Sequence, residues 1–172
     1  MPALVLKAPF AGRAMALSES PDPVFSQGLV GDGIAIDPSM GQVRAPCAGV
    51  IASLQASGHA LTVRAQNGAE LLIHVGVDTV NLKGAGFTLR ASEGQTIAEG
   101  DVLIEFDMDA IRPKVPSLVS MMVVANGDDF TVADQAVGRT VGFGDAVMSV
   151  TPKGTDANAD TTDGENAVDI SV

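Results

Sequence analysis

The spacing of turn residues is the feature that most constrains how this chain can fold. Its 172 residues include 19 glycines and 9 prolines, and between them lie short runs in which apolar and polar residues alternate. Such runs are typical of strands, whereas helical periodicity is weak along the whole chain. We therefore predict an all-β fold, an antiparallel β-sandwich or barrel with short helical turns.

Strands are predicted at residues 4–7, 12–17, 33–37, 41–44, 49–54, 60–65, 70–77, 87–89, 102–107, 118–125 and 146–150. Short helices are predicted at residues 22–25 and 108–114. After Pro152 the chain becomes rich in acids and small polar residues, which have little apolar surface to bury. We therefore expect one domain over residues 1–152, followed by an acidic flexible tail or interdomain linker over residues 153–172.

Composition excludes several classes of function. The net charge of −11 argues against nucleic-acid binding, because such binding depends on Lys and Arg neutralising phosphates. No apolar run has the roughly 20 residues of a membrane helix, and the N-terminus lacks a signal-peptide pattern. The single cysteine, Cys47, follows Pro46 and is interpreted as a small apolar filler. These observations favour a cytoplasmic protein that does not insert in the membrane.

The chain has only two histidines, His59 and His74, and each lies at the end of a strand-like run. On the His74 strand, alternation places the side chains of residues 71, 73, 75 and 77 in the core and His74 on the opposite face, with Leu72 and Gly76. His59 shares its parity with Leu61 and Val63, so we expect it where its strand begins. If the two strands are neighbours, both imidazoles meet in one shallow pocket.

Three chemistries can use a pair of histidines. A zinc site needs three or four ligands, so His59 and His74 would bind zinc only with a carboxylate from a partner, and no intrinsic metal site is predicted. Serine hydrolysis lacks a Gly-x-Ser-x-Gly elbow. A phosphoryl relay needs only a neutral imidazole as nucleophile and a few donors for the phosphoryl oxygens. No cofactor is expected, since the glycine-rich segments match no nucleotide-binding loop.

A series of motifs resembles the glucose-class enzyme IIA component (EIIA type 1) of the phosphoenolpyruvate-dependent sugar phosphotransferase system. The matching residues run in family order over about residues 4–150, and the segment from His74 to Val80 is highly specific. They are Ala8-Pro9 with Gly12, Val24-Phe25, residues 29–36, Ala45-Pro46 with Gly49, Gly58-His59-Ala60, residues 71–80, Leu82-Lys83-Gly84 with Gly86-Phe87, Glu93-Gly94-Gln95, and Gly100-Asp101 with residues 104–107.

The resemblance implies an antiparallel β-sandwich that carries phosphoryl groups. His74 would be phosphorylated on Nε2 by the phosphohistidine carrier HPr, with His59 steadying the phosphoryl group. A cysteine on the IIB domain of a glucose or N-acetylglucosamine transporter would be the acceptor. Ser57 would orient a histidine through its hydroxyl, and Asp78 matches the acid that follows the histidine strand. An apolar ring would bind the protein partners, and its members would be Val24, Phe25, Leu29, Val30, Leu72 and Val80.

Two departures from the family pattern keep an alternative open. Leu72 and Gln55 stand where close relatives commonly carry phenylalanine, so the docking ring is less aromatic. A non-catalytic regulatory binding module on the same fold is the alternative function. The acidic tail fits both a free-standing protein and the first module of a fused IIA–HPr–enzyme I chain.

Overall fold

The structure, a computed structural model, describes residues 3–153. The predicted tail beyond Lys153 therefore lies outside the described residues. Within the described part, no helix is both long enough and apolar enough to cross a bilayer.

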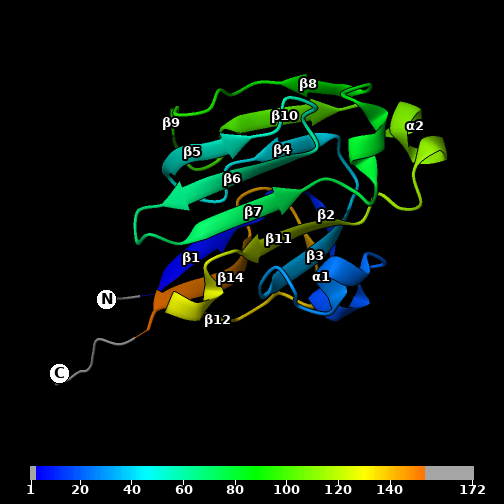
Figure 1. Ribbon diagram of the computed structural model, residues 1–172. Coiled ribbons are helices and arrows are strands. Elements are labelled where there is room, and N and C mark those ends of the chain that lie inside the picture. The colour runs from blue at the N-terminus through cyan, green and yellow to red at the C-terminus, as the bar shows by residue number, and fades with distance from the viewer. Residues whose placement is uncertain (1–2, 154–172) are drawn as a thin grey trace, which may run out of the picture.

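In residues 3–153, fourteen strands form three sheets, and every neighbouring pair with an assigned register is antiparallel (Figure 1). The eight-stranded sheet has the order β13 (Thr140–Val141), β2 (Gly12–Ala16), β3 (Gly33–Pro38), β11 (Ser120–Val124), β7 (Glu70–His74), β6 (Ala60–Ala65), β5 (Gly49–Leu54) and β9 (Thr96–Ile97). One small sheet contains β4 (Gln42–Arg44), β10 (Val102–Phe106) and β8 (Phe87–Leu89). The other contains β1 (Leu4–Lys7), β14 (Ala146–Pro152) and β12 (Phe130–Ala133).

The three sheets enclose one main core. Its members include Leu6 of β1, Leu71 of β7 and Ile104 of β10, all fully buried, so each sheet contributes side chains to it. The predicted antiparallel β-sandwich is confirmed.

A second, smaller cluster lies apart from the main core. Its buried members come from η1 (Leu17–Glu19), α1 (Pro23–Ser26) and the strands β3 and β11: Leu17, Phe25, Ala35, Met121 and Val123. Ala35 and Met121 alternate along their strands with core residues such as Ile34 and Met122. Because side chains alternate between the faces of a sheet, this outer cluster covers the face opposite the main core.

Capping and proline residues explain the short helices. The Asp22 carboxylate accepts a hydrogen bond from the amide of Val24, and Pro23 opens α1, as expected for a helix N-terminus. The predicted helix at residues 108–114 divides into α2 (Met108–Ile111) and η3 (Arg112–Lys114). Pro113 has no amide hydrogen, which disfavours a continued α-helical ladder there. The remaining short helices are η2 (Thr79–Leu82) and η4 (Gly127–Asp129).

The strand predictions agree with the structure at most positions, and the differences concern short or terminal segments. Strands β9, β12 and β13 were not predicted, and β9 and β13 have two residues each. The predicted strand at residues 70–77 ends at His74 in the structure, because Gly76 takes a positive φ of 65° and turns the chain. This turn is the difference that matters for the site.

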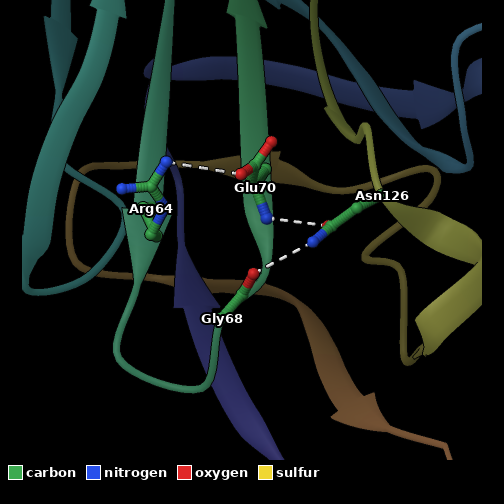
Figure 2. Close-up of polar contacts among 4 residues, drawn as sticks. All are labelled: Arg64, Gly68, Glu70 and Asn126. Carbon is green, nitrogen blue, oxygen red and sulfur yellow. Dashed lines mark hydrogen bonds and ion pairs between the residues drawn. The ribbon is translucent and has the colours of Figure 1, made fainter.

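Asn126 joins the end of β11 to the hairpin between β6 and β7 (Figure 2). Its side-chain oxygen accepts a hydrogen bond from the amide of Glu70 at 2.9 Å, and its amide nitrogen donates to the carbonyl of Gly68 at 3.0 Å. Glu70 also pairs with Arg64 across the hairpin at 3.5 Å, but both side chains are well exposed, so this ion pair adds little. Asn126 therefore links these two segments, together with the backbone hydrogen bond from the amide of Ala125 to the carbonyl of Glu70.

We expect Asn126→Ala to destabilise the fold by about 1–2 kcal/mol, since two backbone groups lose their partners. Asn126→Asp keeps the acceptor for the Glu70 amide and should cost less. Urea unfolding curves measure both. Equal midpoints for Asn126→Ala and the unaltered protein would contradict the role given to this side chain.

Candidate functional site

Alternation along β7 places His74 on the outer face of the large sheet. Leu71 and Ile73 are at most 1% exposed and belong to the main core, whereas Leu72 packs against the outer cluster. His74 is paired with Met121 of β11, another member of the outer cluster, and with Ala60 of β6. The predicted orientation of His74 is confirmed.

The turn after β7 fixes the proton of the His74 ring. His74 Nδ1 lies 2.8 Å from the carbonyl oxygen of Gly76. A carbonyl only accepts hydrogen bonds, so Nδ1 carries the proton and Nε2 of the neutral ring keeps its lone pair. The sequence interpretation, in which Gly76 leaves space beside the imidazole, differs from this arrangement: a Cβ at Gly76 would lie 2.9 Å from Thr79 Cγ2 and 3.1 Å from the Ser117 carbonyl.

His59 comes immediately before β6, as the parity argument predicts, and its ring meets that of His74. The ring centroids are 5.4 Å apart with an interplanar angle of 76°. The backbone joins the pair as well, because the amide of Val75 donates to the carbonyl of His59 at 2.8 Å. His59 is only 8% exposed, and its Nδ1 lies 2.5 Å from the hydroxyl of Ser57. The structure thus brings together the three residues His59, His74 and Ser57.

Gly58 allows Ser57 and His59 to face each other. Its φ of +78° lies in the left-handed region that favours glycine. A Cβ there would approach Phe87 Cβ to 2.9 Å and Leu89 Cδ2 to 3.1 Å. The Ser57–His59 contact therefore depends on close packing between this turn and β8.

Phe25 supports the other side of His74. Its ring centroid is 5.2 Å from that of His74, and Phe25 is only 5% exposed. Phe25 was expected to be part of the docking ring, but its burial leaves little of its surface for a partner to contact. In the structure it packs against the imidazole from α1.

The other apolar residues of the predicted ring differ in exposure. Val24, Leu29 and Val80 are 46%, 71% and 53% exposed. Val30 and Leu72 are partly buried and pack against the outer cluster beneath the site. Together with the first three they form what we call the apolar ring: Val24, Leu29, Val30, Leu72 and Val80.

Burial keeps both imidazoles neutral near neutral pH. It lowers the pKa of His74 below the ordinary value of 6.5, and the neighbouring His59 lowers it further. The Gly76 carbonyl and the carboxylates of Asp22 and Asp78 act in the opposite direction. Burial also lowers the pKa of His59. A neutral imidazole with a free lone pair on Nε2 has the chemistry that a nucleophile needs.

Asp78 begins η2 in a left-handed conformation with φ 59°, which Asp tolerates better than most residues. Its side chain makes no capping hydrogen bond and is exposed. The predicted place of Asp78 beside the site is consistent with its charge acting on His74. Asp22 acts on His74 in the same way but was not singled out from the sequence.

Neither a metal nor a reactive thiol is indicated at this site. Within residues 3–153 no group of three or more His, Cys, Asp or Glu side chains could hold a metal ion. Cys47 is buried, and burial raises the pKa of its thiol to about 11, so it is not a nucleophile at neutral pH.

His59 is buried and His74 is partly buried. A hollow of about 880 Å³ is present between the loop from Gly28 to Asp32 and the segment from Ala125 to Val132, but it contains neither histidine. Leu29 and Val30 line this hollow and also belong to the apolar ring. The exposed apolar side chains of Val24, Leu29 and Val80 can contact another protein.

Comparisons with known proteins agree with this geometry. The family model of the phosphoenolpyruvate-dependent sugar phosphotransferase system, EIIA 1, matches residues 4–130. This chain belongs to that family. A glucose-specific EIIA component of the phosphotransferase system from Bacillus anthracis is 44% identical over 147 residues, which cover 85% of this chain and 89% of the relative. The solved glucose permease IIA of Mycoplasma capricolum superposes with a TM-score of 0.82 at 33% identity, covering 87% of this chain and 96% of that one.

The EIIA 1 family takes part in phosphoryl transfer for sugar uptake, so a transferase role follows for this chain. Sequence reasoning missed three contributors to the site: the carbonyl of Gly76, the charge of Asp22, and the buried hydroxyls of Thr79 and Ser120, which bond the peptide unit between Val75 and Gly76. Only Asp22 had a local signal, the Asp-Pro pair that opens a helix. The other contributors depend on tertiary contacts.

We expect the stability of this EIIA 1 domain to decrease as the pH falls from about 7.5 to about 5. Both histidine pKa values are lower in the folded chain than in the unfolded chain, so the unfolded chain binds protons first. The contribution of the two neutral histidines to the free energy of unfolding is complete above the unfolded pKa of 6.5. It is lost as the pH falls through the lower pKa values of the folded chain.

Urea midpoints across this pH range measure the effect, because few carboxylates titrate there. The double variant His59→Gln/His74→Gln should show a flatter pH dependence than the unaltered protein. Parallel curves for the two proteins would contradict the assignment to the histidines.

Proposed function

We propose that this chain is a phosphocarrier that accepts a phosphoryl group from phospho-HPr on His74 Nε2. It then passes the group to a cysteine on the IIB domain of a sugar transporter. The observation that carries this proposal is the orientation of the His74 ring, with Nδ1 held by Gly76 and Nε2 left with its lone pair. The two relatives described above are both named for glucose, which favours a transporter of the glucose or N-acetylglucosamine class.

The chemistry balances without a cofactor. The Nε2 lone pair forms a bond to phosphorus while the P–N bond to the HPr histidine breaks and its electron pair returns to that nitrogen. The phosphorylated His74 ring keeps its Nδ1 proton and carries a positive charge, which the Gly76 carbonyl stabilises. A thiolate on the IIB domain then attacks phosphorus, and the Nε2 electron pair returns to His74.

His59 and Ser57 supply the stabilising donor in this proposal. With the Ser57 hydroxyl donating to His59 Nδ1, the neutral His59 ring carries its proton on Nε2. That N–H is then available to the phosphoryl oxygens beside His74, as the 5.4 Å separation of the ring centroids allows. His59 therefore acts on the transferring group and not as a second nucleophile.

The carboxylates of Asp22 and Asp78 have two opposite effects in this proposal. They favour the positive charge of the phosphorylated ring, and their charge acts on His74 in that direction. They also repel the phosphoryl oxygens, which keeps the P–N bond from becoming too stable to transfer. A carrier needs both effects, since it must accept and release the same group.

The apolar ring is the docking face in this proposal, and both protein partners use it in turn. Its most exposed member, Leu29, lies on the loop after α1. Val80 lies in η2, which follows His74 in the chain. The acidic net charge of −11 favours partners with basic surfaces. The expected cytoplasmic location is where phosphoenolpyruvate and HPr are available.

We expect His74→Gln to abolish labelling when the protein is incubated with phosphoenolpyruvate, enzyme I and HPr. His59→Gln should still accept the phosphoryl group but transfer it to a IIB domain roughly a hundredfold more slowly, since it loses a donor to the transition state. Phosphohistidine detection and transfer to IIB measure the two steps. A His74→Gln protein that still becomes labelled refutes the nucleophile, and a His59→Gln protein that transfers at the unaltered rate refutes the donor. An unaltered protein that is never labelled favours the non-catalytic binding module.

We expect Leu29→Gln to raise the KM for phospho-HPr about fivefold with little change in kcat, since it removes apolar area that is buried only in the complex. Leu29 is 71% exposed, so the substitution should not disturb folding. Val5→Thr is the matched control, because Val5 is 46% exposed on β1 of a different sheet. Equal effects of the two substitutions on KM would exclude the apolar ring as the docking face.

A further inference from the structure

Two fully buried hydroxyl groups hold the turn that contacts His74. Thr79 and Ser120 are both 0% exposed. The Thr79 hydroxyl donates to the carbonyl of Val75 at 2.5 Å, and the amide of Gly76 donates to the Ser120 hydroxyl at 3.0 Å. That carbonyl and that amide belong to one peptide unit, which is therefore held from both ends.

The next peptide unit carries the contact to the imidazole. Its carbonyl, from Gly76, accepts the hydrogen bond of His74 Nδ1 at 2.8 Å. Its amide, from Val77, donates to the carbonyl of Ser117 at 3.0 Å. The direction of the Gly76 carbonyl is thus set by the preceding peptide unit and by the segment that leads into β11.

The hydrogen position of the Ser120 hydroxyl is determined by its partners. Ser120 Oγ lies 2.8 Å from the carbonyl of Leu118, which can only accept, so the hydroxyl donates there. Its lone pair is then directed at the amide of Gly76. The Ser120 hydroxyl therefore donates to Leu118 and accepts from Gly76, and the Thr79 hydroxyl donates to Val75.

We propose that Ser120 and Thr79 are positioning residues for phosphoryl transfer at His74, which they control by fixing the Gly76 carbonyl. This inference rests on the phosphocarrier role proposed above. The hydrogen bond made by one ring nitrogen determines which nitrogen carries the proton. A Gly76 carbonyl free to rotate would let the proton move to Nε2, and a protonated Nε2 cannot attack phosphorus.

The positive φ of Gly76 explains why the hydrogen bonds of both Ser120 and Thr79 are needed to hold the turn. At φ 65° the turn adopts a conformation that glycine visits freely but that nothing in the residue itself favours. Glycine also has the largest conformational entropy to lose. The hydrogen bonds that Ser120 and Thr79 make with the Val75–Gly76 peptide unit hold the turn in this one conformation.

The test compares variants that remove a hydroxyl bonded to the Gly76 turn with variants that leave the hydrogen bonds of this turn in place. Ser120→Ala and Thr79→Val each remove one of the two hydroxyls, and Thr79→Ser keeps a hydroxyl at position 79. Ser149→Ala is the matched control, since Ser149 is also buried, at 6% exposed, and its hydroxyl bonds Ala133 and Asp134 in another sheet.

The ¹⁵N chemical shifts of the His74 ring report the tautomer, and single-turnover labelling by phospho-HPr reports the rate. We expect Ser120→Ala and Thr79→Val to show a mixture of tautomers and a rate roughly tenfold lower, the scale on which loss of an outer partner of a functional histidine acts. Thr79→Ser should recover the Nδ1–H tautomer that Thr79→Val loses, and Ser149→Ala should keep it.

Folded variants that keep a single Nδ1–H tautomer and the unaltered rate would overturn the inference and leave the two hydroxyls with a purely structural role. If Ser120→Ala does not fold, the comparison of Thr79→Val with Thr79→Ser is enough to test the positioning role. The tautomer is read without any partner protein. A failure of the phosphocarrier proposal, in which the unaltered protein is not labelled, is therefore distinct from a failure of this one.

Discussion

The hydrogen bond from His74 Nδ1 to the Gly76 carbonyl is the interaction on which the site depends. It decides which nitrogen of the imidazole keeps its lone pair, and it exists only because β7 stops at His74 and the chain turns at Gly76. The other parts of the site act around it. Phe25 packs against the ring, His59 lies beside it, and burial keeps the ring neutral.

The two faces of the large sheet carry different sets of residues, the main core on one face and the candidate site on the other. Its inner face belongs to the main core, together with both small sheets. Its outer face carries the second cluster, which supports His74 through Phe25 and Met121. Strand β7 contributes to both, because Leu71 and Ile73 face inward while Leu72 and His74 face outward. A single strand thus anchors itself in the core through Leu71 and Ile73 and carries His74 on the opposite face.

The parts of the site that depend on local sequence could be predicted, and the parts that depend on tertiary contacts could not. Alternation along residues 70–74 placed His74 correctly, and parity placed His59 at the start of its strand. The strand β12 was missed because its four residues follow an acidic segment and are defined by pairing with β14. The Gly76 turn was read as a continued strand, because the hydroxyls that hold it come from Thr79 and, 44 residues away, Ser120. The burial of Phe25 depends on how α1 packs on the sheet, which no local pattern reveals.

The outer cluster shares no buried residue with the main core. Substitutions at positions without common contacts usually have additive effects on folding. Residues such as Leu72 and Val30 can therefore change during evolution while the hydrophobic interior stays as it is. In the proposed carrier role, a few outer side chains are then enough to change the preference for a transporter, while the pair of imidazoles stays the same.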